Sequence, residues 1–291
     1  APAGGSLAAG APTPAASRVT AGRQCGLMIL SAVFTDSCDW QGRRDFSHVS
    51  RVRRLCDSAK LHGVSVTFIY DAAEILKELE GSCSNFDFLR VNISGLNESL
   101  SPNDARFLMY GLLMDSNPAW QTVFMVDAFD VRVGMNPCAK DLDQDVLYVG
   151  DETEKLSLPW IRDRFVELGP MYLQWYDGLR GKAGKPLLNA GIIGGRRDVV
   201  LKFLQRAREA IMGSLEGAID RIYNNQGVWT WAWAGFMGLF RKMPPLVTRF
   251  NMPLLNYIAH TDFEGKFHSG APICSVFRGY EDRADVFFMH K

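Results

Sequence analysis

The sequence predicts an α/β fold in which helices cover both faces of a mainly parallel sheet. Apolar runs with the character of buried strands alternate with helical segments through the first half of the chain. The connections between them are short, as in strand–helix–strand units. The chain has 291 residues, 47% of them apolar, which is enough for one large α/β domain or two smaller ones.

The first two predicted strands enclose a helix. Cys25–Phe34 is a continuous apolar run, which is typical of a buried parallel strand. Ser47–His62 has apolar residues at roughly helical spacing with arginine and lysine on the other face, and Gly63 ends this predicted helix. Val64–Tyr70 is the second predicted strand, and Asp71 follows its carboxyl end.

A short helix, a strand and a longer helix come next. Ala72–Leu79 is the predicted short helix, and Phe86–Ile93 is the third strand. Ser101-Pro102-Asn103-Asp104 carries a capping serine, a proline in the first turn and an acid three residues after the serine, which is typical of a helix start. We expect this helix to end near Met114.

Two further strands lead to a candidate site. Thr122–Val126 is the fourth predicted strand and ends at Asp127, and Val146–Val149 is the fifth and ends at Gly150-Asp151-Glu152. Ligands of open α/β sheets bind at the carboxyl ends of the strands. The residues that we therefore expect on one rim are Thr35, Asp71, Asp127 and Asp151.

The second half of the chain is less regular. Leu187–Gly195 is predicted to be a strand, and Asp198–Met212 a helix with a basic outer face. Asn225–Phe240 is predicted to be helical, and its aromatic side chains suit core packing better than stacking on a sugar acceptor. Ala284–Met289 is the last predicted strand.

The composition argues against several kinds of partner. Lysine plus arginine equals aspartate plus glutamate, at 32 each, and this balance favours neither nucleic acid nor an anionic membrane. The longest uncharged apolar-rich stretch, Gly227–Phe240, is shorter than the ~20 residues that cross a bilayer. We expect no nucleic-acid partner and no membrane contact within this fragment.

The ends of the predicted domain follow from composition. The first 22 residues are rich in alanine, proline and glycine and indicate a flexible linker or stalk. They contain no initiator methionine and no secretory signal, which suggests a fragment of a longer protein. Residues 23–291 are predicted to be one domain with two halves, at about 23–150 and about 151–291.

The cysteines and glycosylation sequons bear on the compartment. The six cysteines include no C-x-x-C pair, and an even number permits disulfides. Two N-x-S/T sequons begin at Asn92 and Asn97. These features favour the lumen of the secretory pathway, the Golgi or the ER, for the catalytic domain of an anchored protein. Free buried thiols in a cytoplasmic enzyme are the alternative.

An acid pair follows the fourth predicted strand. Asp127 and Asp130 flank Ala128 and Phe129 in VFMVDAFDV. Carboxylates this close repel each other and lose hydration unless a cation or hydrogen-bond donors compensate. A divalent metal would do so, and hard oxygen ligands suit Mn²⁺ or Mg²⁺. The spacing alone is equally compatible with one acid capping a turn and the other being solvated.

VDAFDV resembles the D-x-x-D variant of the D-x-D motif of GT-A glycosyltransferases. It is most similar to the glycosyltransferase domain of lysyl hydroxylases, which glycosylates collagen hydroxylysine. The resemblance covers about Gly26 to Lys291 and implies a GT-A, Rossmann-like fold with a mixed, mainly parallel sheet flanked by helices. The other matching segments are Leu188-Asn189-Ala190-Gly191, Asn224-Asn225-Gln226 at the family's Asp-Asp-Gln, and the terminal Asp285–Lys291.

The resemblance implies a set of site residues. Asp127, Asp130 and His290 would bind Mn²⁺ or Mg²⁺, and through it the diphosphate of a UDP-sugar, with His268 as the rival third ligand. Arg106 would reach the donor, although a solvated helix face explains it nearly as well. The implied donor-binding residues are Thr35, Asp71, Arg106, Asp127, Ala128, Asn189, Ala190, Gly191, Gln226 and Lys291.

This chain departs from the family's Asp-Asp-Gln segment in a way that affects catalysis. Asn224 and Asn225 replace its acids, so no carboxylate stands there to act as a nucleophile. A front-face retaining mechanism needs none, because the departing phosphate oxygen takes the acceptor proton. The candidate catalytic residues are Asn189, Asn225 and Asp151, with Glu152 as the neighbouring carboxylate.

These observations predict a metal-dependent, retaining glycosyltransferase that moves a sugar from a UDP-sugar to a hydroxyl of a glycan or glycoprotein. A catalytically inactive module that binds nucleotide sugars or glycans is the alternative, and the amides at Asn224 and Asn225 are its best support. A haloacid-dehalogenase phosphohydrolase would need two acids separated by one residue and then a hydroxyl, whereas Val131 and Arg132 follow here.

Overall fold

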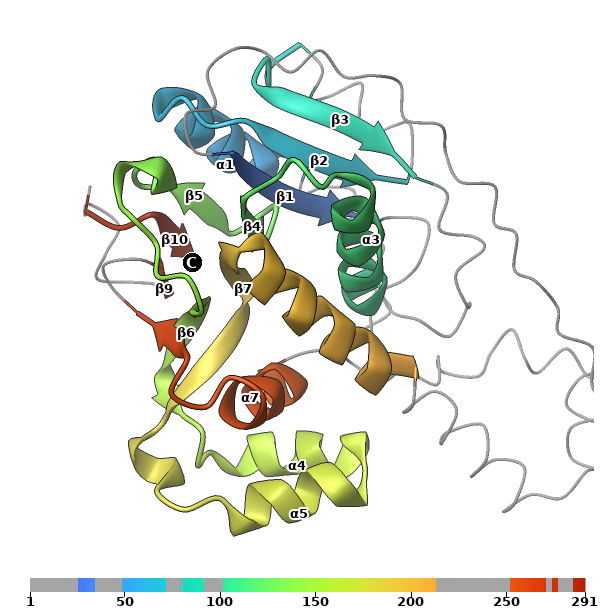
Figure 1. The fold of residues 1–291 in the computed structure, drawn as a ribbon, viewed down its shortest axis with the longest axis vertical. Helices are drawn as coiled ribbons and strands as arrows, with labels where there is room; N and C mark the ends of the chain where they lie inside the picture. Colours follow the sequence, from blue (N-terminus) through green and yellow to red (C-terminus); the bar gives the residue numbers. More distant parts are fainter. Residues whose placement is uncertain are drawn as a thin grey trace, which may run out of the picture.

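The structure is a computed structural model of the chain. It describes residues 26–34, 49–71, 79, 81–91, 102–212, 252–270, 274–276 and 285–290. A seven-stranded sheet in the order β3-β2-β1-β4-β7-β6-β8 forms the centre of the molecule, and a three-stranded sheet in the order β5-β10-β9 lies beside it (Figure 1).

The first half of the chain forms the parallel part of the large sheet. β1 (Leu27–Val33) pairs in parallel with both β2 (Val66–Tyr70) and β4 (Thr122–Val126), and β2 pairs in parallel with β3 (Phe86–Arg90). All five residues of β4 are buried, as its apolar sequence predicts for a central strand. The carboxyl ends of these strands therefore lie along one edge of the sheet.

β7 (Pro186–Arg196) is the one described strand of the large sheet that runs the other way. It is antiparallel to β4 on one side and to β6 (Leu147–Lys155) on the other, and β6 is parallel to β8 (Phe267–Ser269). The predicted fold class, an α/β fold with a mixed, mainly parallel sheet flanked by helices, is confirmed. The reversed direction of β7 brings its first half to the carboxyl ends of β4 and β6.

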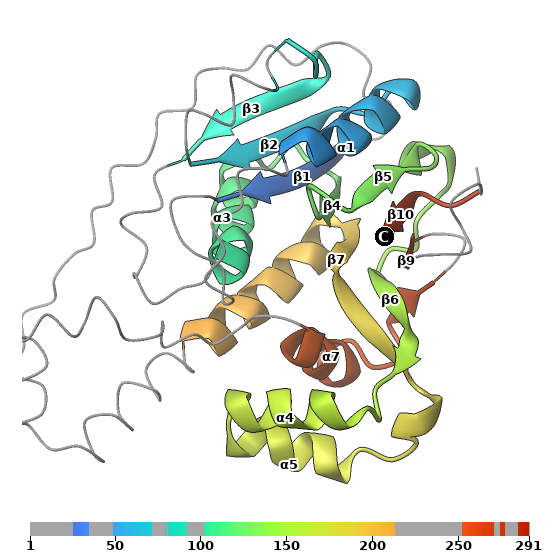
Figure 2. The ribbon, with the colours of Figure 1, turned by 180° about the vertical axis from the view of Figure 1, so that it is seen from behind.

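Helices cover both faces of the sheet. α3 (Pro102–Ser116) lies in front of the strands in Figure 1 and α1 (Val49–Leu61) behind them, and the order reverses in Figure 2. Side chains of β1 alternate between the two cores, with Met28 and Leu30 packed on the α3 side and Leu27 and Ile29 on the α1 side. Burial on both faces explains why β1 reads as a continuous apolar run.

The predicted helix before β2 forms as α1 and ends where glycine permits it. Gly63 has a φ of 63°, a left-handed conformation that favours glycine. Its N–H donates to Lys60 O (3.2 Å), and the next N–H, of Val64, donates to Ala59 O (2.8 Å). The chain can therefore turn directly into β2.

The small sheet carries the C-terminal strand back to the end of β4. β5 (Val131–Val133) pairs with β10 (Phe288–His290) in antiparallel register, and β10 pairs in parallel with β9 (Cys274–Val276). His290 lies opposite Val131, one residue beyond Asp130. A histidine near the end of the chain is thereby placed beside the acid pair.

The second half adds a helical layer at one end of the molecule. α4 (Pro159–Leu168) and α5 (Pro170–Gly178) each begin with a proline in the first turn and form a hairpin beside α7 (Met252–Thr261). Residues 197–212 form a further helix, as predicted. None of the helices in the described ranges is long and apolar enough to span a bilayer.

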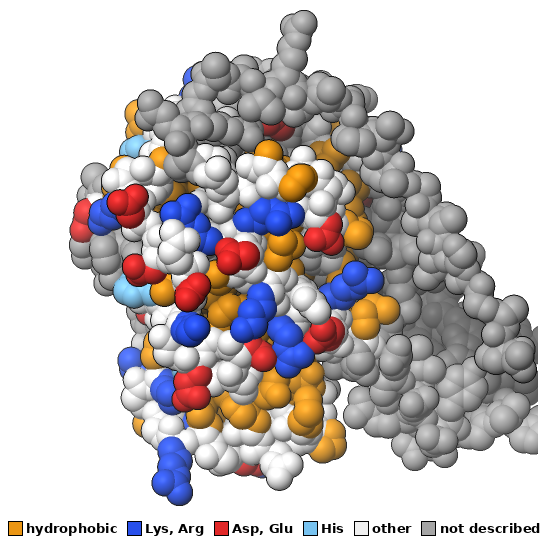
Figure 3. Space-filling view, in the orientation of Figure 1, with side chains coloured by type: hydrophobic (Ala, Val, Ile, Leu, Met, Phe, Trp, Pro, Cys, Tyr) orange, Lys and Arg blue, Asp and Glu red, His pale blue; other side chains and the backbone are white. Residues whose placement is uncertain are grey.

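Charged side chains of both signs are interspersed on the face seen in Figure 3, in keeping with a net charge of zero. Hydrophobic side chains gather toward the end of the molecule that holds the α4–α5 hairpin. Trp160, Val166 and Met171 of that hairpin are 39%, 51% and 58% exposed. This face carries no extended surface of one sign that would attract a polyanion.

Most predicted strands have somewhat different bounds in the structure, and two of these differences affect the site. The fifth predicted strand continues as β6 through Asp151 and Glu152 to Lys155, because this polar stretch pairs with the start of β7. The last strand is β10, which begins at Phe288 and includes His290, whereas the prediction ended it at Met289. The predicted linker 1–22, helix Asn225–Phe240 and all but the last residue of helix Ala72–Leu79 lie outside the described residues.

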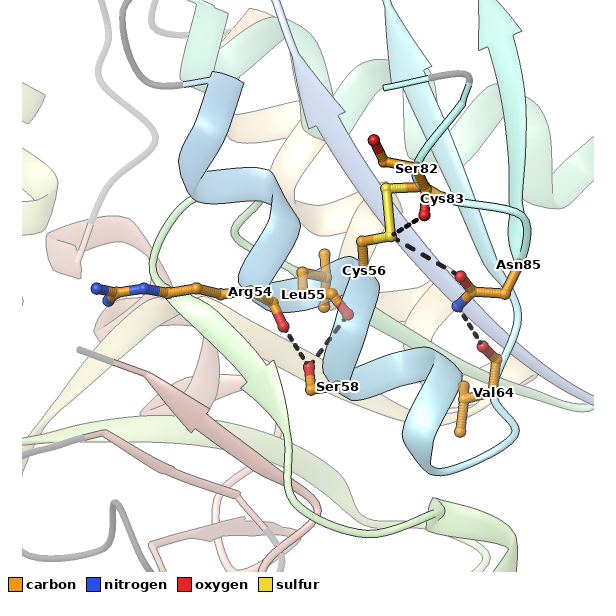
Figure 4. The surroundings of a disulfide bond; sticks show 8 residues. All are labelled: Arg54, Leu55, Cys56, Ser58, Val64, Ser82, Cys83 and Asn85. Atoms are coloured by element: carbon orange, nitrogen blue, oxygen red, sulfur yellow. Dashed lines mark hydrogen bonds between the residues drawn. A yellow bond between two sulfur atoms is a disulfide. The ribbon is translucent and has the colours of Figure 1, made fainter. Parts of the chain in front are cut away.

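A disulfide joins α1 to the turn before β3 (Figure 4). Cys56 and Cys83 are 27 residues apart, with Cα atoms separated by 5.6 Å. The amide of Asn85 donates to Val64 O (3.1 Å) beside it. Cys138 is disulfide-bonded as well. Closing a loop of this length stabilises a fold by ~3.5 kcal/mol in the chain-entropy account.

Candidate functional site

The candidate site lies where β4 ends and meets the reversed strand β7. Asp127 is the first residue after β4, and its backbone N–H donates to Gly191 O of β7 (2.9 Å). The side chain of Asp127 is 28% exposed, so its carboxylate is partly covered and still open to solvent. The predicted acid after the fourth strand is therefore held by the sheet itself.

Arg106 of α3 forms an ion pair with Asp127. Its guanidinium lies against Asp127 Oδ1, and the Arg106 side chain is 13% exposed. One helical turn later, the phenol of Tyr110 is buried, and burial raises the pKa of Tyr110. Arg106 Nε and Tyr110 Oη have no hydrogen-bond partner among the described residues. Arg106 faces the site, so the alternative of a solvated helix face is excluded.

His290 of β10 approaches the other oxygen of the same carboxylate. His290 Nε2 lies 3.4 Å from Asp127 Oδ2, and the His290 side chain is 10% exposed. Both ring nitrogens of His290 are buried and have no hydrogen-bond partner within the described part of the chain. The Asp127 carboxylate thus lies between a guanidinium and an imidazole that come from opposite ends of the sequence.

The electrostatics of the cluster follow from this placement. Burial by itself would raise the pKa of Asp127, but Arg106 and then His290 outweigh it and hold the pKa well below its usual range. Burial by itself would lower the pKa of His290, but Asp127, and to a smaller extent Asp130 and Glu152, raise that pKa above its ordinary value. Asp127 is therefore an anion that attracts cations. A protonated His290 is such a cation and would compete with a metal ion for the Asp127 carboxylate.

Gly191 makes the contact between β7 and His290 possible. A Cβ atom at this position would lie 2.6 Å from His290 Nε2 and 2.8 Å from Asn189 Oδ1, closer than real Cβ atoms approach. Glycine is therefore required by the packing of β7 against the C-terminal strand. The resemblance implies that Gly191 contacts the donor, and the structure shows that His290 packs against this glycine.

Asn189 is held between Gly191 and Glu152. Its Oδ1 accepts a hydrogen bond from the Gly191 N–H (2.5 Å), and its Nδ2 donates to Glu152 Oε1. Asn189 is 9% exposed, and Ala190 next to it is buried. Sequence reasoning placed Asn189 at the site but did not assign Glu152 as its partner.

Asp151 lies on the other side of β6. An added Cβ at Gly270 would lie 3.1 Å from Asp151 Oδ2, which places this carboxylate against the end of β8. Burial raises the pKa of Asp151, and the neighbouring Glu152 adds to the rise. His268 of β8 stacks edge-on against Tyr148, with ring centroids 6.0 Å apart. Among contacts of the described residues, none joins His268 to Asp127 or Asp130, whereas His290 contacts Asp127 directly.

The other predicted site residues divide into two groups. Asp71 is buried at the end of β2, where its backbone carbonyl accepts a hydrogen bond from Arg90 Nε (3.2 Å), and Ala128 is buried in the turn after β4. They share the rim with Asp127, as predicted. The predicted residues that lie outside the described ranges are Thr35, Asn224, Asn225, Gln226 and Lys291.

The predicted metal ligands are neighbours, but they are not arranged as a formed metal site. In the described ranges, no group of three His, Cys, Asp or Glu side chains has a geometry that could hold a metal ion. The ion pair with Arg106 engages one oxygen of Asp127 instead. The donor types nevertheless fit, since two carboxylates and an imidazole suit Mn²⁺, and neither nitrogen of His290 has a hydrogen-bond partner among the described residues.

The likeness of this chain to known proteins is distant. No family model matches the chain. No curated protein matches it in sequence. Among solved structures, the chain is similar to a glycosyltransferase involved in the glycosylation of the major capsid of PBCV-1, with 13% identity, 91% of each chain covered and a TM-score of 0.42.

Proposed function

We propose that this protein is a metal-dependent glycosyltransferase. It transfers a sugar from a UDP-sugar to a hydroxyl group of a glycan or glycoprotein, with Mn²⁺ or Mg²⁺ as the cofactor. The observation that carries the proposal is the Asp127 carboxylate, held at the carboxyl end of β4 between Arg106 and His290. An anion, a guanidinium and an imidazole that meet at the carboxyl end of β4 suit a metal together with a diphosphate.

Each residue has a role in this proposal. Asp127, Asp130 and His290 would hold the metal, which would offset the negative charge that develops on the departing diphosphate. Arg106 would release Asp127 and donate hydrogen bonds to phosphate oxygens, since a guanidinium binds phosphate in a fixed two-pronged geometry. Asn189 would donate to a hydroxyl of the sugar, and Gly191 would let the backbone approach it.

The proposed transfer retains the configuration of the sugar. The bond between the anomeric carbon and the phosphate oxygen breaks, and the acceptor oxygen forms its bond on the same face. The acceptor proton passes to the departing phosphate oxygen, so that no protein nucleophile is required. The amide at Asn225 is compatible with this route. Asp151 lies on the side of β6 away from Asn189 and has no role in the proposed transfer.

The disulfides support the proposed compartment. Cys56–Cys83 is formed and Cys138 is disulfide-bonded, and such bonds persist in oxidising compartments. We place the protein in the lumen of the Golgi or the ER, as the catalytic domain of an anchored protein. Glycoprotein acceptors are available there.

The test is the release of UDP or GDP from a panel of UDP- and GDP-sugars with Mn²⁺. We expect turnover of a UDP-sugar that EDTA abolishes and that Asp127→Asn lowers by on the order of 10²–10³-fold. Asp177→Asn, which removes a surface ion pair with Arg162, is the matched control and should keep wild-type activity. Turnover that does not need a metal would contradict the proposal.

A module without catalysis is the second candidate, because amides stand at Asn224 and Asn225. Titration of UDP in the presence of Mn²⁺, beside the turnover measurement, separates the two functions. Binding of UDP without turnover of any sugar nucleotide would favour the module.

A further inference from the structure

Glu152 and Asp151 are neighbours on β6, but their carboxylates lie on opposite sides of the strand. Glu152 Oε1 accepts a hydrogen bond from Asn189 Nδ2 on β7, whereas Asp151 lies against Gly270 at the end of β8. Successive side chains of a strand point to opposite faces, so only one of the two acids can reach Asn189. Glu152 is that acid.

The Glu152 carboxylate determines which way the Asn189 amide points. In the observed orientation, Oδ1 accepts from the Gly191 N–H (2.5 Å) and Nδ2 donates to Glu152. A flipped amide would set its oxygen against the carboxylate and its NH₂ group against the Gly191 N–H, and both contacts would be repulsive. Among the described residues, the second hydrogen of Nδ2 has no acceptor, which leaves it for a ligand.

The same hydrogen-bonded chain reaches the acid at the end of β4. Gly191, whose N–H is bound by Asn189, accepts through its carbonyl a hydrogen bond from the Asp127 N–H (2.9 Å). A Cβ added at Gly191 would also lie 2.6 Å from His290 Nε2, so little space separates β7 from this ring. A change at Glu152 would act first on the orientation of Asn189, its hydrogen-bond partner.

We propose that Glu152 is a positioning residue for the donor sugar, which acts by orienting the Asn189 amide so that its free N–H meets a hydroxyl of the sugar. This inference rests on the proposed glycosyltransferase function. Glu152 itself does not touch the substrate. Its main effect should fall on the sugar end of the donor, because its hydrogen-bond partner among the described residues is Asn189 and not a residue of the Arg106–Asp127 pair.

The experiment compares Glu152→Ala and Glu152→Gln with the wild type. The matched control is Glu154→Ala, an exposed acid two residues later on the same strand. The measurements are UDP release from UDP-glucose and UDP-galactose with Mn²⁺, the dissociation constant of UDP with Mn²⁺ by calorimetry, and thermal unfolding to show that each variant is folded.

We expect Glu152→Ala to lower kcat/KM by about 10- to 100-fold, the usual effect of removing a residue that orients a ligand-binding group. The dissociation constant of UDP should change less than about twofold, since UDP lacks the sugar. Glu152→Gln should recover most of the activity, because its amide oxygen can still accept from Asn189. Glu154→Ala should match the wild type.

Three results would overturn the inference while leaving the proposed function intact. They are unchanged kcat/KM in Glu152→Ala, an equal loss in Glu154→Ala, and a loss of UDP affinity as large as the loss of turnover. A wild-type protein that neither binds UDP nor turns over a UDP-sugar would instead overturn the proposed function, and this inference with it.

Discussion

The Arg106 guanidinium and the Asp127 carboxylate form an ion pair at the centre of the rim, between α3 and the end of β4. The two residues are 21 apart in sequence, and their pair joins α3 to the end of β4. Burial of this kind makes an ion pair costly to break unless each partner finds a new counter-charge. A metal bound to Asp127 and a phosphate bound to Arg106 would provide both counter-charges at once.

Arg106 and a metal would compete for the Asp127 carboxylate. The ion pair therefore predicts that binding of the metal and binding of the nucleotide affect each other. In Arg106→Gln, we expect Mn²⁺ alone to bind more tightly, because Asp127 is free. UDP should bind less tightly by roughly 10- to 150-fold, which corresponds to ~1.5–3 kcal/mol for a hydrogen bond to a charged group. Calorimetric titration of Mn²⁺, of UDP and of both together measures the coupling.

The control for this prediction is Arg164→Gln, which removes an ion pair with Glu167 on the surface of α4. It should leave both affinities at the wild-type level. Weaker binding of Mn²⁺ alone to Arg106→Gln would show that the arginine supports the metal site instead of competing with it.

Gly191 predicts a steric effect on His290. In Gly191→Ala, the added methyl would lie 2.6 Å from His290 Nε2, so the ring or β7 must move. We expect a loss of ~1–3 kcal/mol in the free energy of unfolding, as for other overpacked sites, together with weaker Mn²⁺-dependent binding of UDP. Urea unfolding and calorimetry measure the two effects.

Gly111→Ala is the matched control, because a Cβ at this position of α3 meets no atom within 4 Å. It should stabilise the protein by ~0.5–1 kcal/mol, since alanine loses less conformational freedom in a helix than glycine. If Gly191→Ala were as stable as the wild type and bound UDP equally well, the packing of His290 on β7 would be unimportant.

His260 of α7 predicts a pH dependence of stability. Burial, and then the charge of Lys185, lower the pKa of His260 to about 4, and its ring packs edge-on against Phe267 with centroids 5.0 Å apart. The unfolded chain binds a proton below about pH 6.5, the ordinary histidine value, and the folded protein does not until about pH 4. The stabilisation is therefore complete above pH 6.5 and is lost as the pH falls toward 4.

We expect His260→Phe to remove this dependence. Between pH 7.5 and pH 5, the wild type should lose ~1–2 kcal/mol more of its free energy of unfolding than the variant, after a discount for the part of the ring that solvent reaches. Urea unfolding at the two pH values measures the difference. A variant that loses as much stability as the wild type would show that His260 titrates normally.

Local sequence predicted the strands whose burial is uniform. Thr122–Val126 is predicted and observed with the same bounds, because a threonine and four apolar residues between polar neighbours suit a strand covered on both faces. β6 was predicted too short, since its second half, GDETEK in residues 150–155, is polar. That half is a strand because it pairs with β7, a contact between segments that local pattern does not reveal.

The partners of the site residues were less accessible to sequence reasoning. Asp151 and Glu152 are adjacent acids at one strand end, and alternation shows only that they face different sides. Which of them faces Asn189 depends on the register shift between Val149 and Gly150 in the β6–β7 pairing. The ion pair with Arg106 likewise depends on how α3 packs on the sheet.

The amino-acid order alone specified an α/β sheet and an acid at the carboxyl end of a buried strand. These are local properties, because hydrophobic periodicity and residue type are sufficient to predict them. The direction of β7, the approach of His290 to Asp127 and the orientation of Asn189 by Glu152 come from contacts between distant segments. Such contacts form only when the whole chain packs, because a single carboxylate can accept several different partners until the surrounding strands exclude all but one arrangement.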